Sequence, residues 1–332
     1  MRIEQFDARF DADQLRGCFE IVAAGQRLDD PGLPVRSLTS FRDRWTSGFS
    51  GQPRQSWLGV DAAGEPVGCY LLTLPELENT TVGWCTLAVA PARRRSGAGR
   101  ALLAHCASQA GLAGRLRLAS EARDGSPGSD FAAAAGAVSG LAEGIRRLDF
   151  DGGLPGRLAG LRGAAGKHAS GYSVVSWIGA SAADTLDDQA LLSAAMADAP
   201  RDPGVEPEAW DAERILELER ICLGSGQQFY SVAARHDATG RLVAITQVYV
   251  EPDTPGWGFQ MTTAVLPAHR GHRLGLLVKA EMLGLLAGHE PRVRHILTGN
   301  AESNQHMIAI NEQLGFTVAA VYRSWDLDLA AI

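Results

Sequence analysis

Two segments of the chain, one in each half, share the same order of residues: an apolar run, a proline, a turn rich in arginine or glycine, and a helix-forming run. The first copy, residues 85–103, reads CTLAVAPARRRSGAGRALL, and the second, residues 261–277, reads MTTAVLPAHRGHRLGLL. A repeated strand–turn–helix unit predicts that each half of the chain folds as a copy of one arrangement. This repeat constrains the fold more than any single motif.

The similarity of the two halves extends on both sides of the turn. Residues 3–21 and 173–196 each read as a strand followed by a helix. Downstream, each half closes with a helix, ending near residues 136 and 316, and a final strand. The chain is therefore interpreted as a tandem duplication.

The predicted fold class follows from this duplication. We expect an α/β (α+β) protein with two tandem domains, each with a mixed, mainly antiparallel sheet flanked by helices. The expected limits are 1–150 for the first domain, 151–170 for a linker that contains six glycines, and 171–332 for the second domain.

The repeated turn predicts an anion site. A glycine-rich turn that leads into a helix points free backbone N–H groups toward one place, and a phosphate or pyrophosphate binds well there. In this sequence the turn backbone is that of residues 94–99 in the first copy and 270–275 in the second.

Composition narrows the classes of function. The chain is 45% apolar and 21% charged, with a formal net charge of −7 and a pI near 5.6, which argues against nucleic acid as a partner. No apolar run approaches the roughly 20 residues of a membrane-spanning helix, and the first residues do not resemble a signal peptide. We therefore expect no membrane partner.

Cysteine usage indicates the redox environment. The five cysteines are scattered and never stand in CxxC spacing, so neither a disulfide framework nor a metal site is predicted. A reducing, cytoplasmic location is expected. The sequence does not indicate an oligomeric state.

The motifs together carry a resemblance to a known family. The strand, the VxPxxRxxGxG pattern of residues 89–99, the helix, a further strand and a helix ending in Leu-Gly-Phe resemble the acetyl-CoA binding core of the GCN5-related N-acetyltransferases (GNAT superfamily). Residues 300–316, NAESNQHMIAINEQLGF, are similar to the last motif of that family. The resemblance covers nearly the whole chain, twice, and implies two tandem GNAT-like domains with acetyl-CoA as the acyl donor.

The resemblance also implies where the donor binds. The end of the strand and the turn that follows it are the expected contacts of pantetheine and pyrophosphate. In the second domain these residues are Ala264, Val265, Leu266, Arg270, Gly271, His272, Arg273, Leu274 and Gly275. In the first domain they are Val89, Arg94, Arg95, Ser96, Gly97, Ala98 and Gly99.

The two copies differ in the residues expected beside the thioester. The second keeps Asn304 and Asn311, whereas the matching helix of the first copy has only Phe131 and alanines. The second domain is therefore the favoured catalytic one. Many family members have a tyrosine, the general acid, at the position of Asn311, and neither copy has it. Glu302 is the nearest candidate for the general base.

Two functions remain open from the sequence. The first is acyl-CoA-dependent N-acyltransferase activity, with acetyl transfer to a primary amine of a small metabolite. The alternative is a catalytically inactive tandem module that binds or senses CoA, or binds a partner protein. The missing tyrosine favours the second, and the asparagine motif favours the first.

Overall fold

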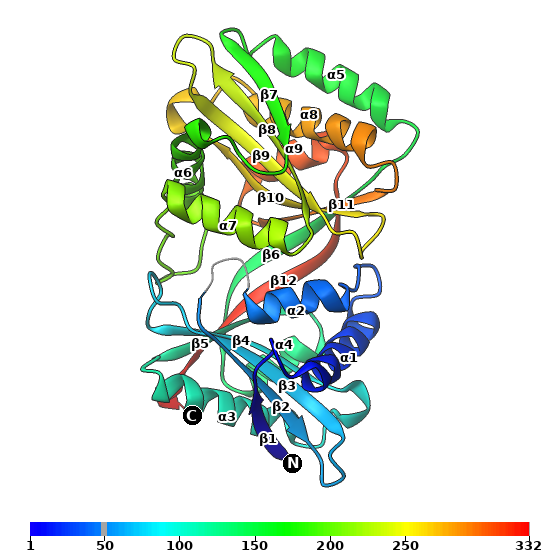
Figure 1. Ribbon diagram of the computed structural model, residues 1–332, viewed down its shortest axis with the longest axis vertical. Helices are drawn as coiled ribbons and strands as arrows, with labels where there is room; N and C mark the ends of the chain where they lie inside the picture. Colours follow the sequence, from blue (N-terminus) through cyan, green and yellow to red (C-terminus); the bar gives the residue numbers. More distant parts are fainter. Residues whose placement is uncertain (48–51, 332) are drawn as a thin grey trace. The chain divides into compact units, whose positions relative to one another are not determined.

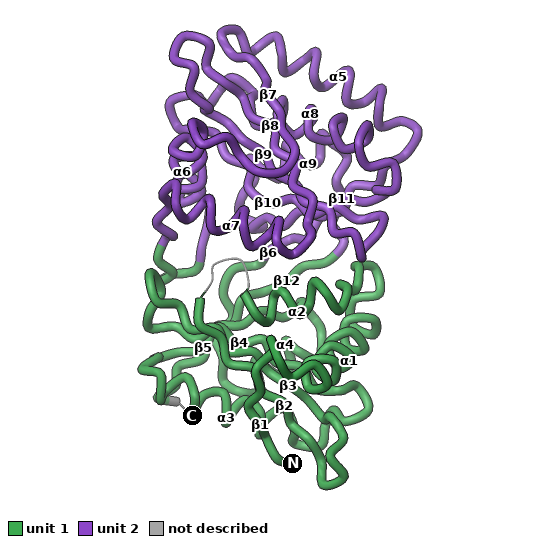
Figure 2. The backbone as a smooth tube through the Cα atoms, viewed as in Figure 1, with its two compact units in different colours: residues 1–142, 202–206, 320–332 green, residues 143–201, 207–319 purple. Residues whose placement is uncertain are grey.

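The computed structural model describes residues 1–47 and 52–331, which form two compact units (Figure 2). Unit 1 comprises residues 1–142, 202–206 and 320–332, and unit 2 comprises residues 143–201 and 207–319. Within the described residues no helix is both long and apolar enough to cross a bilayer.

The sheet of unit 1 has the strand order β1-β2-β3-β4-β5-β12 (Figure 1). Neighbouring strands are antiparallel except β4 and β5, which run parallel. The strands are β1 (Arg2–Phe6), β2 (Arg54–Val60), β3 (Pro66–Thr73), β4 (Val82–Val89), β5 (Arg117–Arg123) and β12 (Thr317–Asp328). The helices are α1 (Ala12–Asp29), α2 (Leu38–Thr46), α3 (Ala98–Leu112) and α4 (Pro127–Ala134).

The alternation along β3 explains why helices cover both faces of this sheet. Cys69 and Leu71 belong to the core under α1 and α2, whereas Tyr70 and Leu72 belong to the core under α3. Successive side chains of a strand point to opposite faces, so a strand that is apolar at every position buries both faces.

The sheet of unit 2 has the order β6-β11-β10-β9-β8-β7, with β10 and β11 as its parallel pair. The strands are β6 (Val138–Asp149), β7 (Tyr172–Ile178), β8 (Gln228–His236), β9 (Leu242–Val250), β10 (Trp257–Val265) and β11 (His295–Ala301). The helices are α5 (Leu154–Gly166), α6 (Leu186–Ala194), α7 (Ala212–Gly224), α8 (Leu274–His289) and α9 (Gln305–Leu314).

Helix α8 is the centre of unit 2. It packs on β8, β9 and β10 with one side and on α5 with another, so it is buried almost all round. A helix that is apolar on all sides belongs in an interior of this kind. On the opposite face of the sheet α6 covers β9 and β10.

Each sheet ends in a strand from the other half of the sequence. Residues 143–149 of β6 pair with β11 in unit 2, and residues 322–328 of β12 pair with β5 in unit 1. Residues 154–166 form α5 of unit 2. The limits of the compact units therefore differ from the sequence-based limits at 150 and 171. The predicted fold class itself, mixed and mainly antiparallel sheet structure with flanking helices in both halves of the chain, is confirmed.

The exchanged strand gives a prediction about stability. Leu148 of β6 is 1% exposed in the core of unit 2. Replacing it with alanine should destabilise unit 2 by about 2–5 kcal/mol, because a buried leucine leaves a cavity. Hydrogen exchange should then accelerate in β11 and α8 and stay unchanged in β2 and β3. Leu112→Ala, at a position that is 79% exposed, is the control. Faster exchange in β2 and β3 alone would contradict the assignment of Leu148 to unit 2.

Candidate functional site

The parallel strands of unit 2 separate soon after they begin. Only Trp257, Gly258 and Phe259 of β10 pair with β11, opposite His295–Leu297. From Gln260 onward β10 keeps its pairing with β9 alone. The β11 side of this segment therefore has backbone groups that no strand of the described residues pairs with, and these groups can bind an extended ligand.

A β-bulge lies where the strands separate. The register of β10 on β9 shifts between Gln260 and Thr263, so two residues of β10 stand opposite one residue of β9. A bulge bends its strand and redirects the local N–H and C=O groups. In unit 1, β4 also leaves β5 after three pairs, but the register of β4 on β3 has no shift. The two units thus differ at the centre of the candidate site.

The predicted turn follows β10 directly. After a short 3₁₀ turn (Pro267–His269), Gly271 and Arg273 both adopt left-handed backbone conformations, with φ of 87° and 54°. Alternating conformations of this kind point successive N–H groups into one concavity, at the N-terminus of α8. The same positions in unit 1, Arg95 and Gly97, are also left-handed, with φ of 62° and 87°.

A cavity of ≈ 750 Å³ lies between these elements. It contains eight of the predicted residues of the second copy, and the bulge residues Met261 and Thr263 also line it. The eight are Ala264, Val265, Arg270, Gly271, Arg273, Leu274, Gly275 and Asn304. Of the remaining predictions, Leu266 packs against the cores of unit 2, and the Nδ1 atom of His272 lies 3.2 Å from the carbonyl oxygen of His168.

The three predicted catalytic side chains have other partners. The side-chain oxygen of Asn304 accepts a hydrogen bond from the N–H of Met307 at 3.2 Å and so caps α9. Asn311 is fully buried, donates to Oδ1 of Asn300 at 2.5 Å, and leaves its own Oδ1 without a partner. Glu302 accepts from Arg146 at 2.7 Å. Because this ion pair already occupies an oxygen of the carboxylate, the geometry does not favour Glu302 as the general base.

The sequence reasoning missed a buried, charged side chain of this cavity. Lys279, on α8, is 2% exposed and lines the cavity, and its Nζ atom lies 2.9 Å from Oε1 of Gln260. Burial lowers the pKa of Lys279 to about 7. A signal was present: Lys279 is one of only two lysines in the chain, and it interrupts an apolar helix.

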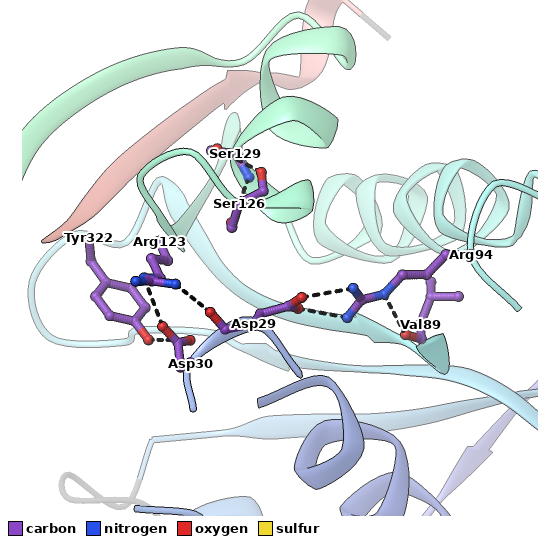
Figure 3. A network of polar contacts seen from close by, with 8 residues as sticks. All are labelled: Asp29, Asp30, Val89, Arg94, Arg123, Ser126, Ser129 and Tyr322. Atoms are coloured by element: carbon purple, nitrogen blue, oxygen red, sulfur yellow. Dashed lines mark hydrogen bonds and ion pairs between the residues drawn. The ribbon is translucent and has the colours of Figure 1, made fainter. Parts of the chain in front are cut away.

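In unit 1 the corresponding region is bridged by internal ion pairs (Figure 3). Arg94 forms a bidentate pair with Asp29 at 2.7 and 3.0 Å, and its Nε lies 3.4 Å from the carbonyl oxygen of Val89, at the end of β4. Arg123, at the end of β5, binds the backbone of Asp29 and the carboxylate of Asp30. The network thus links the ends of the two separating strands of unit 1.

A similar pair in unit 2 is more exposed. Arg270 lies 2.7 Å from Asp198, and its Nε lies 3.3 Å from the carbonyl oxygen of Val265. The two side chains are 49% and 57% exposed, against 24% and 22% for Arg94 and Asp29. Exposed pairs contribute little, typically about 0–1 kcal/mol. Arg270 can therefore release its partner for a phosphate at lower cost than Arg94.

The other residues of the first turn have local roles. The Ser96 hydroxyl donates to the carbonyl of Arg93 at 2.7 Å, and Ala98 begins α3. A side chain at Gly99 would meet the ring of Phe131 at 3.3 Å, whereas one at Gly275 would meet Ile310 at 3.4 Å. Within the described residues no group of three or more His, Cys, Asp or Glu side chains is arranged to hold a metal ion.

Replacing Arg273 should raise the stability of the protein and weaken its binding of CoA. A left-handed arginine is strained, so Arg273→Gly should stabilise the protein by about 1 kcal/mol. The side chain has no ion-pair partner within the described residues. Loss of its charge should nevertheless weaken CoA binding several-fold, because charged groups strengthen phosphate contacts. Thermal unfolding and calorimetry measure the two effects. Arg273→Asn, which tolerates this backbone but is uncharged, should lose the same affinity; unchanged affinity in both variants would contradict a phosphate contact.

Comparisons with known proteins agree with this geometry. The sequence model of the Acetyltransferase (GNAT) family matches residues 22–125. A tandem GNAT protein from the clavulanic acid biosynthesis pathway, solved without acetyl-CoA, has a TM-score of 0.81 and 26% identity over 99% of this chain and 98% of its own. A GCN5-related N-acetyltransferase from Sphaerobacter thermophilus has a TM-score of 0.71 and 15% identity, over 99% and 95% of the two chains. No curated protein sequence matches the chain.

Proposed function

We propose that the chain is a tandem, two-domain member of the GNAT superfamily that acetylates a primary amine of a small metabolite with acetyl-CoA as the donor. The general activity of the family is acyl-CoA-dependent N-acetylation. We place the reaction in unit 2. The observation that carries this proposal is the cavity of ≈ 750 Å³, which joins the left-handed turn, the separated strand β10 and helix α9.

The residues around the cavity fit CoA in three ways. The backbone from Arg270 to Gly275 offers N–H groups and a helix N-terminus to a pyrophosphate. The unpaired side of β10 suits the amide groups of pantetheine, which can bind as an added strand. The amide side chains of Asn300 and Asn304, which line the cavity, offer polar groups to the thioester end of the donor.

The reaction requires the protein mainly to position the two substrates and to place polar groups beside the thioester. The amine attacks the thioester carbonyl, and an N–H group of the bulged strand can hold the developing oxyanion, a contact worth about 3 kcal/mol. Acetyl-CoA supplies the activated acyl group. The chain binds and orients it, and must deprotonate the amine and protonate the thiolate.

Three observations support the alternative function, which is CoA binding without catalysis. Glu302 is paired with Arg146, Asn304 caps a helix, and the position of Asn311 lacks the family tyrosine. Thiol release on mixing the protein with acetyl-CoA and a panel of amines separates the two functions. We expect amine-dependent thiol release; CoA binding without release for any amine would support the alternative.

Matched glycines test which unit is active. Gly275 and Gly99 hold the same place in the two turns, and a side chain at Gly275 would contact Ile310 at 3.4 Å and Val265 at 3.7 Å. We expect Gly275→Val to crowd the cavity and to weaken CoA binding about tenfold or more, or about 1.4 kcal/mol. Gly99→Val should leave turnover nearly unchanged. Circular dichroism checks that both variants fold, and the reverse pattern would place catalysis in unit 1.

Asn304 gives a test of capping against catalysis. Asn304→Ala should destabilise α9 by about 0.5–2 kcal/mol through loss of the cap, and turnover should fall several-fold. Serine also caps helices, so Asn304→Ser separates the two roles. Full turnover in Asn304→Ser with a loss in Asn304→Ala would assign Asn304 to positioning of α9, whereas equal losses would assign it to a direct contact with the donor.

A further inference from the structure

The side chain of Lys279 lies where β10 separates from β11, and Gln260 orients it. The amide nitrogen of Gln260 donates to Oγ1 of Thr246 at 2.9 Å and to the carbonyl of Gln247 at 2.6 Å. Both donors of that amide are therefore used, and Oε1 faces Nζ of Lys279. Gln260 is also the first residue of β10 beyond the pairing with β11. The amine thus lies where the strands separate.

A comparison between the two copies shows that this lysine is not needed for the fold. When Gly99 is aligned with Gly275, Lys279 corresponds to Leu103, which packs against the core of unit 1. The helix accommodates leucine at this position. Burying an amine costs free energy that an apolar side chain does not. A role in folding therefore does not account for a lysine at this position, whereas a role in function does.

The choice of lysine over arginine points to proton transfer. Only two of the 31 Lys and Arg residues of the chain are lysines, and the other, Lys167, is exposed. A guanidinium stays charged in proteins, whereas a buried lysine readily loses its proton. The buried basic residue of the cavity lining is thus the one that can be deprotonated.

We propose that Lys279 is the general acid of the reaction and donates a proton from Nζ to the sulfur of the departing CoA thiolate. The inference rests on the proposed function. As the amine attacks, the C–N bond forms and the C–S bond breaks, with the electron pair leaving on sulfur. The Nζ–H proton passes to that sulfur. Lys279 then regains a proton, through solvent, from the acylated nitrogen, so the proton of the amine ends on the thiol.

The proton affinities of the two groups suit this transfer. Burial lowers the pKa of Lys279 to about 7, and an ordinary alkyl thiol has a pKa of about 8.5. Transfer from the ammonium to the thiolate is therefore downhill. Asn311, at the position of the family tyrosine, has no proton to give. Two histidines, His269 and His306, also line the cavity, but neither is buried, whereas Lys279 lies buried where the strands separate.

The surroundings of Lys279 contain no competing charge. It forms no ion pair within the described residues, and burial is the only cause of its pKa shift. The helices and strands packed against α8 are α5, α9, β8, β9 and β10. The groups beside Nζ are the Gln260 amide of β10 and the face of the Phe316 ring, which lies between α9 and β12 in the chain and has its centroid 5.4 Å away.

Kinetics of matched variants test the proposal. Lys279→Leu copies the residue of unit 1, and should lower kcat by about 10²-fold or more while acetyl-CoA affinity changes little. Lys279→Arg should not restore kcat, because arginine keeps its protons. Lys167→Leu is the control and should behave as wild type. Thermal unfolding should show that Lys279→Leu is at least as stable as wild type. An unchanged kcat in a folded Lys279→Leu variant would overturn the proposal.

The pH profile separates an acid from a base. An acid must be protonated, so kcat of the wild type should fall as the pH rises through the pKa of Lys279, and this limb should be absent in Lys279→Leu. A rising limb that disappears in the same variant would make Lys279 a base and overturn the proposal.

Carbon-13 labelling of lysine gives a readout without turnover. The chain should show two lysine side-chain signals, and Lys279→Leu assigns them. The Lys279 signal should titrate near pH 7 and shift when CoA is added. Titration near the ordinary value of about 10.4, with no response to CoA, would overturn the proposal even in an active enzyme. Failure of the proposed function is seen separately, as a wild-type protein that releases no thiol with any amine, and it also overturns the acid role.

Discussion

The separation of β10 from β11 after three paired residues is the constraint on which the site of unit 2 depends. Strands that stayed paired would satisfy each other's backbone groups and leave no room between them. Because β10 departs at Gln260, its backbone is free on one side, the turn after Val265 can face the opening, and the side chain of Lys279 reaches it from α8. The bulge at the same place adds a change of direction to the strand.

The two copies share a strand–turn–helix frame and differ in the partners and the burial of their charged side chains. In unit 1, Arg94 and Arg123 are tied to Asp29 and Asp30, and the ends of β4 and β5 are linked through them. In unit 2, Arg270 keeps only an exposed partner, and a lysine replaces the apolar residue of the first copy. These differences need no change of fold, because they concern side chains around an unchanged strand–turn–helix frame.

The last strand of each half of the sequence pairs with strands of the other half. Leu148, encoded in the first half, is part of the core of unit 2, and Leu327, encoded in the second, is part of the core of unit 1. Each unit therefore needs residues from both halves of the chain. The duplication is visible in the sequence as two halves, whereas each folded sheet combines segments of both.

The sequence alone determined the duplication, the type of each sheet and the place of the turn, because these depend on local patterns: apolar strands, a proline, and residues 94–99 and 270–275 before a helix. Tertiary structure decided the rest. The exchange of β6 and β12 depends on long-range pairing that no local pattern encodes. The roles of Asn304 and Glu302 depended on their nearest partners, the N–H of Met307 and Arg146. Lys279 stands within an apolar helix in the sequence, and only packing places it in the cavity, where burial lowers its pKa.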